Sequence, residues 1–522
     1  MLALQDPLAA RPDALHPRHH ALHYDITIAV SDTGNHFAGE VTTSWQLASS
    51  DPVVVELDTV YRVVRALIDG RENSRLRRTE FAVDGGLVII PHGKHAGDTL
   101  QTRIRYHGYP REGLVIRRQG GAITVFADNW PDRAHKWFPS QDLPADKATV
   151  TLHIEAPPGH RVIANGTLLR VDSLPGGRTQ WHYQLDRPVS TYNMVLGIAK
   201  FAVTSLPSGG CALRCIPLSV WALAADSANA QIPFRRAGDM IDWFQQQLGP
   251  FPYPSLAHVE SSTIFGGMEN ATAIFYDQRA MGRGRMSEET VAHETAHQWF
   301  GDAVTESDWH HLWLSEGFAT FLAAEWRGHA DGDSAREGSF ARMRSTVMAS
   351  PVTERPIIDP AATDLMGLLN SNNYPKGALV LRALQGMIGD SAFWRGLRTY
   401  QARFRDGNAL SSDFASVMSE SAGRDLNGFF REWLTQPGYP RLEVTRAYDR
   451  RARRLTLTVR QTQAEGWGTW TLPQLAFALD GDIRHADVAG RSTTLVFENV
   501  AKEPVTITVD PMNQWLLAAT VR

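Results

Sequence analysis

The chain has few cysteines, no long apolar run and no strong excess of charge of either sign. No apolar stretch reaches about 18 residues, which argues against a membrane-spanning helix. A formal net charge of −4 gives no reason to expect nucleic acid or an anionic membrane as a partner. Apolar residues make up 43% and charged residues 21% of the sequence, as in an ordinary soluble globular protein. The length of 522 residues predicts several domains, and we expect three.

The two cysteines of the chain are Cys211 and Cys215. They either bridge a short loop in an oxidising compartment or remain two reduced thiols near a strand. No further cysteine or nearby histidine pair completes a zinc site with them, so we favour an interpretation without a functional role.

The N-terminal stretch MLALQDPLAARPDALHPRHH lacks a basic segment followed by an apolar one, which a secretory signal would need. We therefore expect either a cytoplasmic protein or an exported one whose signal is absent from this numbering. The sequence leaves these two alternatives open.

The order of secondary-structure signals predicts a multidomain α+β protein. From about residue 21 to residue 205, runs such as HYDITIAV and KATVTLHIEA alternate with turn signals, which predicts strands. From about Pro233 to Thr435 the apolar period is helical, as in FRRAGDMIDWFQQQLG, and after QPGYP at 436–440 the strand pattern returns. We predict an N-terminal β domain at 1–204, a mainly helical domain at 205–437 and a C-terminal β-sandwich at 438–522.

The most informative stretch is SEETVAHETAHQWFGDAVTESDWHHLWLSE, residues 287–316, which contains the pentapeptide H-E-x-x-H. On an α-helix, His293 and His297 lie on one face, so both imidazoles can reach one metal ion. Glu294 lies about 100° around the helix, close enough to act on a metal-activated water without being a ligand. Ser287 is a good N-cap, and two glutamates follow it in the first turn, where the helix dipole favours negative charge.

A catalytic zinc needs a third protein ligand. The extended motif H-E-x-x-H-x-x-G-x-x-H does not apply, because Phe300 and Ala303 occupy the positions of its glycine and third histidine. Glu316 instead follows His297 after eighteen residues and opens a second apolar helical pattern from Trp313 to Trp326. Two histidines and one glutamate leave a tetrahedral site one position short, and water or substrate binds there.

A chance pentapeptide is the alternative interpretation. With 19 histidines in 522 residues, a random H-E-x-x-H is expected in roughly a few per cent of such chains. Ordinary buried or surface histidines would then explain both residues. The helical context and the glutamate that opens the next helix favour the metal site.

Two further stretches fit a peptide-hydrolysing site. In GGMEN, residues 266–270, the glycines let backbone approach a ligand closely, and Glu269 could bind a cation such as an α-amino group. Taken alone, however, this pattern is more often a turn. In NYPKGA, residues 373–378, Tyr374 precedes a helix start. It is either a core residue or, in a zinc peptidase, a hydrogen-bond donor to an oxyanion.

In their order and spacing, these motifs resemble the aminopeptidase N family of zinc metallopeptidases, the gluzincin group that also contains the leukotriene hydrolase. The first motif matches the family's G-x-M-E-N, and HETAHQWFGD continues to LWLSEGFAT at 312–320. The likeness extends over nearly the whole chain, through YHGYPREGL at 106–114, FPSQDLPADKATVTL at 138–152, STYNMVLG at 190–197 and QPGYPRLEV at 436–444.

The resemblance implies a saddle-like N-terminal β domain, a thermolysin-like catalytic domain and a small β-sandwich. It implies one Zn²⁺ per chain, with peptides that have a free amino terminus as substrates. The residues and roles that it implies are the zinc ligands His293, His297 and Glu316, the general base Glu294, the amine-binding Glu269, the peptide-lining Gly266, Gly267 and Met268, and the oxyanion-stabilising Tyr374.

The chain departs from many relatives in a loop of the N-terminal domain. Those relatives carry a Gln and, two residues later, a Glu or Gln that helps to hold the amino end. Here Asp128, Asn129 and Trp130 stand in that place. Asp128 could supply a second negative charge, whereas Trp130 either forms a wall of the first side-chain pocket or only packs at a domain junction. The substrate preference is therefore in doubt. Asp302 is expected to support the site structurally.

A second departure lies at the end of the chain, where the strand pattern runs to Arg522 and no large helical C-terminal domain follows. We expect a more open cleft and no counterpart of the carboxylate-recognising basic groups of the leukotriene hydrolase, which weakens an epoxide-hydrolase interpretation. The alternatives to an aminopeptidase are thus another hydrolase on this scaffold, such as an endopeptidase, or a non-catalytic peptide-binding protein. The latter has no need of Glu294 beside the metal.

Overall fold

The computed structural model describes residues 19–31, 35–69, 76–78, 80–119, 122–211 and 213–522. Most of the N-terminal stretch considered above for a signal lies outside these residues. The described residues form two compact units. One unit holds the chain up to Asp308 together with Gln401–Ala409, and the other holds Trp309–Tyr400 together with Leu410–Arg522.

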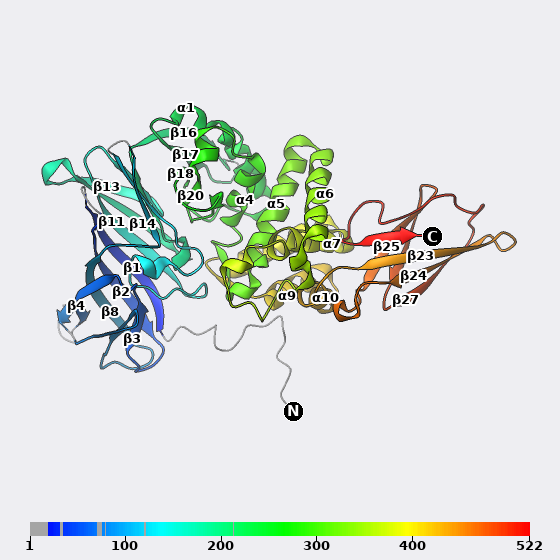
Figure 1. Cartoon of the computed structure of the whole chain (residues 1–522), viewed down its shortest axis with the longest axis horizontal. Helices are drawn as coiled ribbons and strands as arrows, with labels where there is room; N and C mark the ends of the chain where they lie inside the picture. The colour runs from blue at the N-terminus through cyan, green and yellow to red at the C-terminus, as the bar shows by residue number, and fades with distance from the viewer. Residues whose placement is uncertain (1–18, 32–34, 70–75, 79, 120–121, 212) are drawn as a thin grey trace. The chain divides into compact units, whose positions relative to one another are not determined.

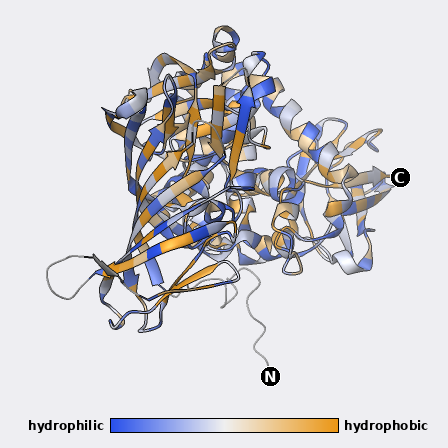
Figure 2. Cartoon of the chain, turned by 60° about the vertical axis from the view of Figure 1, so that its left-hand side comes forward, coloured by the Kyte–Doolittle hydropathy of each residue, from blue (hydrophilic) through white to orange (hydrophobic). Residues whose placement is uncertain are grey.

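The first unit begins with an eight-stranded sheet (Figure 1). Along β1 and β2, every second side chain is buried, which is the pattern of a sheet with one face in the core. Figure 2, which colours the chain by hydropathy, shows bands of apolar and polar residues alternating along strands. In spatial order the strands are β13 (Thr167–Ser173), β14 (Thr179–Ser190), β11 (Lys147–Ala156), β1 (His19–Val30), β2 (Phe37–Leu47), β8 (Thr99–Gly108), β4 (Tyr61–Asp69) and β5 (Leu76–Arg78).

Two smaller sheets complete the N-terminal β region. Tyr24 of the large sheet packs edge-on against Phe138, and Tyr106 donates a hydrogen bond of 2.7 Å to the carbonyl of Trp137, so buried aromatic side chains line its inner face. The first small sheet contains β12 (Arg161–Ala164), β15 (Leu196–Ala199), β10 (Ala122–Ala127) and β9 (Leu114–Gln119), and the second contains β3 (Val53–Glu56), β7 (Leu87–Ile90) and β6 (Ala82–Asp84).

A five-stranded mixed sheet follows in the same unit. Its order is β16 (Phe201–Gly209), β17 (Ile216–Leu223), β18 (Leu256–Ser261), β20 (Ala273–Asp277) and β19 (Gly267–Met268). The sequence predicted helix from Pro233, and α2 (Ala237–Leu248) confirms the first part of that prediction. The strands β18 and β20 were not predicted, because each is a short, fully apolar or buried run that periodicity cannot distinguish from a helix.

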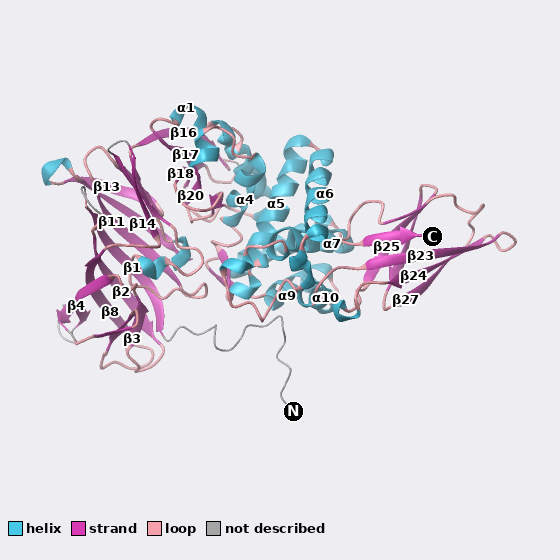
Figure 3. Ribbon diagram, viewed as in Figure 1, coloured by secondary structure: helices cyan, strands magenta, loops and turns pink. Residues whose placement is uncertain are grey.

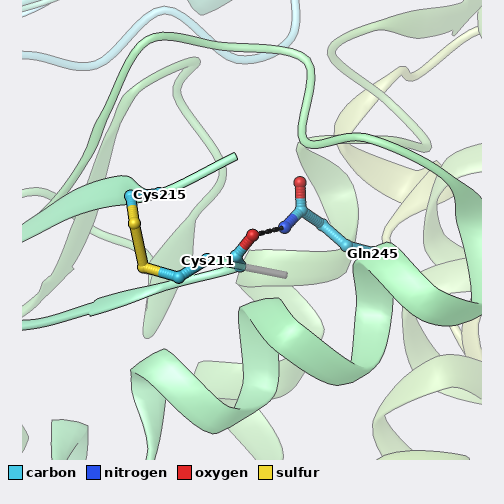
Figure 4. Close-up of a disulfide and its surroundings, with 4 residues drawn as sticks. Cys211, Cys215 and Gln245 are labelled. Carbon is cyan, nitrogen blue, oxygen red and sulfur yellow. Dashed lines mark hydrogen bonds between the residues drawn. A yellow bond between two sulfur atoms is a disulfide. The ribbon is translucent and has the colours of Figure 1, made fainter. Parts of the chain in front are cut away.

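The two cysteines are bridged: Cys211 and Cys215 form a disulfide that closes a short loop between β16 and β17 (Figure 4). Gln245 of α2 holds the start of this loop, since its Nε2 donates to the carbonyl of Gly210 at 2.8 Å. The structure therefore corresponds to the first of the two alternatives that the sequence left open.

The second unit is built around helices, drawn in cyan in Figure 3. α5 (Trp313–Asp331) packs against α6 (Asp333–Ala349) and α7 (Gly377–Ile388), and its buried face includes Phe318, Phe321 and Leu322. Gly317 and Gly377 let α5 and α7 approach closely, because a Cβ on either glycine would lie 3.1 Å from the Cα of the other. Further helices are α8 (Asp390–Phe404), α9 (Ser411–Ala422) and α10 (Asn427–Thr435).

Two sheets form the C-terminal part of the second unit. Phe477 and Phe497 come from different sheets and have ring centroids 6.1 Å apart, so the sheets share an apolar interior. The first sheet has the order β27 (Ser492–Phe497), β24 (Arg454–Gln461), β23 (Arg441–Asp449) and β29 (Ala518–Val521), and the second has β26 (Asp482–Val488), β25 (Leu472–Leu479) and β28 (Ile507–Val509).

The predicted fold class is confirmed: the chain is a multidomain α+β protein with an N-terminal β-rich region, a helical region and C-terminal β sheets. Domain boundaries at residues 204 and 437 stay a prediction. Among the residues that the structure describes, no helix combines the length and apolar character that crossing a lipid bilayer requires.

Candidate active site

The H-E-x-x-H motif lies on helix α4 (Glu288–His297), as the sequence predicts. Ser287 caps the helix, because its Oγ accepts a hydrogen bond of 3.0 Å from the backbone N–H of Thr290. Glu288 in the first turn forms an ion pair of 2.6 Å with Arg236. The cap and the acidic first turn together fix where the helix begins, and so which face its histidines occupy.

The two histidines of α4 face each other on one side of the helix. The Nε2 atoms of His293 and His297 lie 3.0 Å apart, and the ring centroids are 4.7 Å apart. The Nδ1 of His297 lies 2.9 Å from the carbonyl oxygen of Phe300, so this nitrogen carries the proton and donates it. The Nε2 lone pair of His297 is thereby left for a cation, which is how a ligand histidine is oriented in metal sites.

Glu316 supplies the third candidate ligand from the first turn of α5. Its carboxylate accepts a hydrogen bond of 2.7 Å from the hydroxyl of Tyr374. His293, His297 and Glu316 form a candidate group of metal ligands. Two imidazole nitrogens and one carboxylate are a donor set that suits Zn²⁺, so these residues form a candidate zinc site.

Glu294 is 6% exposed and lies directly against the backbone of Gly267. An ideal Cβ on Gly267 would be 2.2 Å from Glu294 Oε1, so a side chain at this position would displace the Glu294 carboxylate. The glycine thus permits the close approach of the 266–270 segment to α4, which the sequence anticipated only in general terms.

Gly267 and Met268 form the short strand β19 at the edge of the five-stranded sheet. β19 pairs antiparallel with β20 on one side only. An edge strand of this kind can add an extended peptide through its free side. Gly266 precedes the strand, and its carbonyl accepts a hydrogen bond of 3.0 Å from the N–H of Asp277.

Glu269 follows this strand and is 5% exposed. Ligand atoms of Glu269, Glu294 and His297 all lie within 4.8 Å of one another. Two carboxylates and an imidazole that meet in this way form a strongly electronegative cluster, which can bind a cationic group such as an ammonium.

Gln298, the residue after the motif, was missed by the sequence analysis. Its fully buried amide donates to the carbonyl of Glu269 at 2.8 Å and to Asp302 Oδ2 at 2.7 Å, while its oxygen accepts from the N–H of Thr272 at 3.0 Å. One side chain thus ties the Glu269 loop to the end of α4. Its position beside His297 was the available signal, but the loop that it reaches depends on the tertiary structure.

Asp302 supports Gln298 from a fully buried position. Burial raises the pKa of Asp302 well above its usual range, and the charge of Glu269 adds to this effect. Lys147 of β11 donates from its Nζ to the carbonyls of Asp302 and Ala303 at 2.8 and 3.1 Å, which fixes the turn that follows α4. The expected supporting role of Asp302 is therefore carried by a defined hydrogen bond to Gln298.

Asp128 and Trp130 are both buried in the first unit. The carboxylate of Asp128 forms an ion pair of 2.8 Å with Arg133, which balances its charge, while burial raises the pKa of Asp128. Trp130 packs edge-on against Phe265, the residue before the peptide-lining segment, with ring centroids 6.2 Å apart. Their expected roles in substrate recognition stay predictions, and the Arg133 partner was not foreseen.

Tyr374 lies in a π-helical turn, Asn372–Lys376, immediately before α7. Pro375 stands inside this turn, and the wider π geometry is common at functional sites. Tyr374 directs its hydroxyl at Glu316. The sequence analysis expected a helix to begin just after Tyr374, and α7 begins there. The hydroxyl of Tyr374 donates a hydrogen bond to Glu316, a candidate metal ligand.

Comparison with known proteins agrees with these motifs. Residues 233–433 match the peptidase family M1 domain and residues 20–193 match the peptidase M1 N-terminal domain. The chain is 29% identical over 417 residues to a probable aminopeptidase 1 of Sulfurisphaera tokodaii, covering 76% of this chain and 51% of the relative. It is 27% identical over 426 residues to a leucyl aminopeptidase of Saccharolobus solfataricus, covering 76% and 51%.

A glutamyl aminopeptidase of Sus scrofa is 27% identical over 475 residues, which covers 83% of this chain and 48% of the relative. The chain thus spans about half the length of the curated relatives that it matches. The two family domains cover both the N-terminal β region and the helices that carry the candidate zinc site. On these grounds the chain belongs to peptidase family M1, the aminopeptidase N-like zinc peptidases.

Proposed function

We propose that this chain is a zinc-dependent aminopeptidase that hydrolyses the N-terminal bond of peptides. The observation that carries the proposal is the convergence of Glu269, Glu294 and His297 within 4.8 Å. It brings a carboxylate able to bind an amine next to a carboxylate able to accept a proton, beside one of the candidate zinc ligands.

His293, His297 and Glu316 would hold the zinc ion, since two imidazoles and one carboxylate are a donor set that suits it. When bound there, zinc supplies a Lewis acid that polarises a carbonyl and lowers the pKa of water. The carbonyl of Phe300 keeps His297 in the required tautomer. The hydroxyl of Tyr374 holds the carboxylate of Glu316 in place.

The substrate would bind as an additional strand on the free edge of β19. Backbone hydrogen bonds to Gly266, Gly267 and Met268 would recognise the main chain without regard to its side chains. Glu269 would bind the ammonium group of the first residue through a charge-assisted hydrogen bond. Because Gln298 fixes the Glu269 loop to α4, the amine is held at a constant distance from Glu294, and only the first peptide bond reaches the base.

Glu294 would act as the general base and then as the general acid. Its carboxylate takes a proton from the attacking water and passes it to the nitrogen of the leaving amine, so one residue serves both steps. The closeness of Gly267 leaves no side chain between the bound main chain and this carboxylate. Glu294 is thereby placed beside the scissile bond.

Tyr374 would stabilise the oxyanion that forms on the substrate carbonyl. Its hydroxyl carries one proton, which is directed at Glu316 in the structure. The hydroxyl must therefore turn from Glu316 toward the oxyanion as charge develops there. Trp130 would form a wall of the pocket for the first side chain through its contact with Phe265. Asp128 would add negative potential only to the extent that Arg133 leaves it uncompensated.

The test is hydrolysis of a panel of aminoacyl chromogenic amides and their N-acetylated counterparts, for the wild type and Glu269→Gln. This variant keeps the size of the side chain and removes its charge. We expect only free-amine substrates to be cleaved, with activity lost to a chelator and restored by Zn²⁺. A hydrogen bond to a charged group contributes about 1.5–3 kcal/mol, so kcat/KM of Glu269→Gln should fall about 10- to 100-fold.

Two other outcomes would contradict the proposal. Equal cleavage of free and acetylated substrates would show that Glu269 does not select an amine and would indicate an endopeptidase. No cleavage across the panel by protein that contains zinc would indicate a peptide-binding role.

A further inference from the structure

A second pair of histidines lies on the large N-terminal sheet. His153 of β11 and His182 of β14 are directly opposite each other in an antiparallel pair, and the two strands run side by side in Figure 1. Their Nδ1 atoms are 2.5 Å apart and their ring centroids 4.7 Å apart. His182 is buried, with 4% of its side chain exposed, whereas His153 is 24% exposed.

The far nitrogen of each ring faces a carboxylate. Nε2 of His182 lies 2.9 Å from Asp172 Oδ2, and Nε2 of His153 lies 3.4 Å from Asp25 Oδ1. The carboxylate of Asp172 accepts a hydrogen bond from His182 Nε2, so His182 Nδ1 keeps its lone pair. When His153 also carries its proton on Nε2, toward Asp25, its Nδ1 lone pair faces that of His182, and a cation can lie between them.

The same arrangement holds His293 and His297 in the candidate active site. There too the facing nitrogens are close, at 3.0 Å, the ring centroids are 4.7 Å apart, and the far nitrogen of His297 is held by an oxygen acceptor. An oxygen acceptor behind a ligand histidine is the usual way to fix its tautomer and raise its basicity. In the pair on the sheet, His182 has this support from Asp172 at 2.9 Å, and the carboxylate of Asp25 lies 3.4 Å from the far nitrogen of His153.

We propose that His153 and His182 bind a divalent transition-metal ion, Zn²⁺ or Cu²⁺, as a site separate from the candidate active site. Imidazole suits both ions, and water would complete the coordination. Zn–N bonds of about 2.0–2.1 Å in tetrahedral geometry place two ligand nitrogens about 3.3 Å apart, so the rings must separate slightly. The partial exposure of His153 permits that movement.

The charges around the pair favour a cation. Asp25 and Asp172 are 45% and 46% exposed, and each lies behind one ring. Arg170, which lies opposite His182 on β13, forms an ion pair of 3.0 Å with Asp172, so its charge is compensated. Burial is the largest cause of the lowered pKa of His182, so this imidazole is neutral and keeps a lone pair at neutral pH.

A neighbouring cluster on the same unit lacks these features. In the group formed by Glu56, His135 and Asp142, one nitrogen, His135 Nδ1, lies 2.8 Å from Asp142 Oδ2 and 3.6 Å from Glu56 Oε2. That nitrogen faces two carboxylates and not a second imidazole. The donor geometry, and not merely the presence of histidine and carboxylate, distinguishes the pair on the sheet.

A metal ion at this site would join β11 to β14 without contacting the residues proposed for catalysis. It would bind the folded protein only, because unfolding separates the two strands. We therefore expect the ion to raise the unfolding temperature and to leave peptide hydrolysis unchanged.

The test is equilibrium dialysis of the full chain against buffered free Zn²⁺, with the metal per chain measured by mass spectrometry. The variants are His153→Gln and, as a matched control, His23→Gln, whose histidine lies on β1 and bonds to Thr149 through Nδ1 at 2.7 Å. We expect the wild type and His23→Gln to bind one more ion than His153→Gln. This difference does not depend on whether the chain is an aminopeptidase.

A second variant, Asp172→Asn, keeps both imidazoles and should weaken the additional binding about 10- to 100-fold, as loss of an outer carboxylate does elsewhere. Equal zinc content in the wild type and His153→Gln would overturn the proposal. Equal loss in His153→Gln and His23→Gln would overturn it as well, since it would show unspecific binding by surface histidines.

Discussion

The two histidine pairs of this protein reach similar geometry through different secondary structures. His293 and His297 are four residues apart on one helix, whereas His153 and His182 are 29 residues apart and meet across two strands. The helical pair is fixed by local geometry, so its spacing can be recognised in the sequence. The strand pair depends on the register between β11 and β14, which only the folded sheet defines.

The surroundings of the two pairs differ: those of the helical pair suit catalysis, whereas those of the strand pair suit only metal binding. Beside the helical pair lie the carboxylates of Glu269 and Glu294, both close to His297, and an edge strand with a free side. Beside the strand pair, both nearby carboxylates are occupied by the far nitrogens of the rings. A base near a metal activates water, whereas a carboxylate bound to a ligand only orients it.

We expect the largest difference between the two pairs when one histidine of each pair is replaced. We expect His297→Gln to reduce peptide hydrolysis to background and to lower the bound zinc, because a ligand and its tautomer-fixing bond to Phe300 are lost. His153→Gln should keep full hydrolysis. Steady-state kinetics and metal analysis on both variants check this, and a similar loss of activity in both would show that the sheet also serves catalysis.

Glu294 is a second difference between the two pairs, because we assign no comparable base to the strand pair. We expect Glu294→Gln to lower kcat about 10²- to 10⁴-fold, which is the usual contribution of a general base, while zinc content stays at the wild-type level. The amide keeps the side-chain size, so the contact with Gly267 should persist. A variant with nearly normal kcat would exclude Glu294 as the base.

Tyr374 marks a further difference, since its hydroxyl is the donor that would meet developing charge. Removal of one oxyanion donor costs about 10²- to 10³-fold in kcat, and we expect Tyr374→Phe to fall in this range with little change in KM. Stopped-flow or steady-state assays with a single amide substrate measure it. If KM rises while kcat is unchanged, the hydroxyl acts in substrate binding or merely holds Glu316.

The elements that the sequence predicted well are those whose signals are local. The cap at Ser287, the helix through His297 and the helix from Trp313 were all predicted, because capping and a 3.6-residue period act within a few residues. The short buried strands β18 and β20 were missed, since a fully buried run shows no alternation.

The candidate site was predictable to the extent that its residues lie in continuous motifs. The proposed ligands and Glu294 stand in such motifs, and His293, His297 and Glu316 form a candidate metal-ligand group. Gln298 and Arg133 were not recognised, because their importance arises from partners that the fold brings to them. Glu269 could be proposed from its neighbours in sequence, but the closeness of its loop to α4 needed the structure.

His258 differs from both pairs, because it lies in the core and is not proposed to bind a metal ion. It is fully buried, stacks on Phe234 with ring centroids 4.4 Å apart, and lies 3.1 Å from the hydroxyl of Tyr276 through Nδ1. Burial lowers the pKa of His258 to about 3 in the folded protein, whereas an unfolded chain has a histidine pKa of about 6.5. Its core position therefore requires the neutral ring.

This histidine should make the fold sensitive to acid. Between pH 6.5 and pH 3 the unfolded chain binds a proton at His258 that the folded protein does not, so stability is full above pH 6.5 and falls as the pH is lowered. At pH 5 the loss amounts to about 2 kcal/mol. We expect His258→Asn to lack this part of the loss when urea unfolding is compared at pH 7 and pH 5. Because other titrating groups are common to both proteins, identical pH dependence in the two would show that His258 is protonated in the folded state.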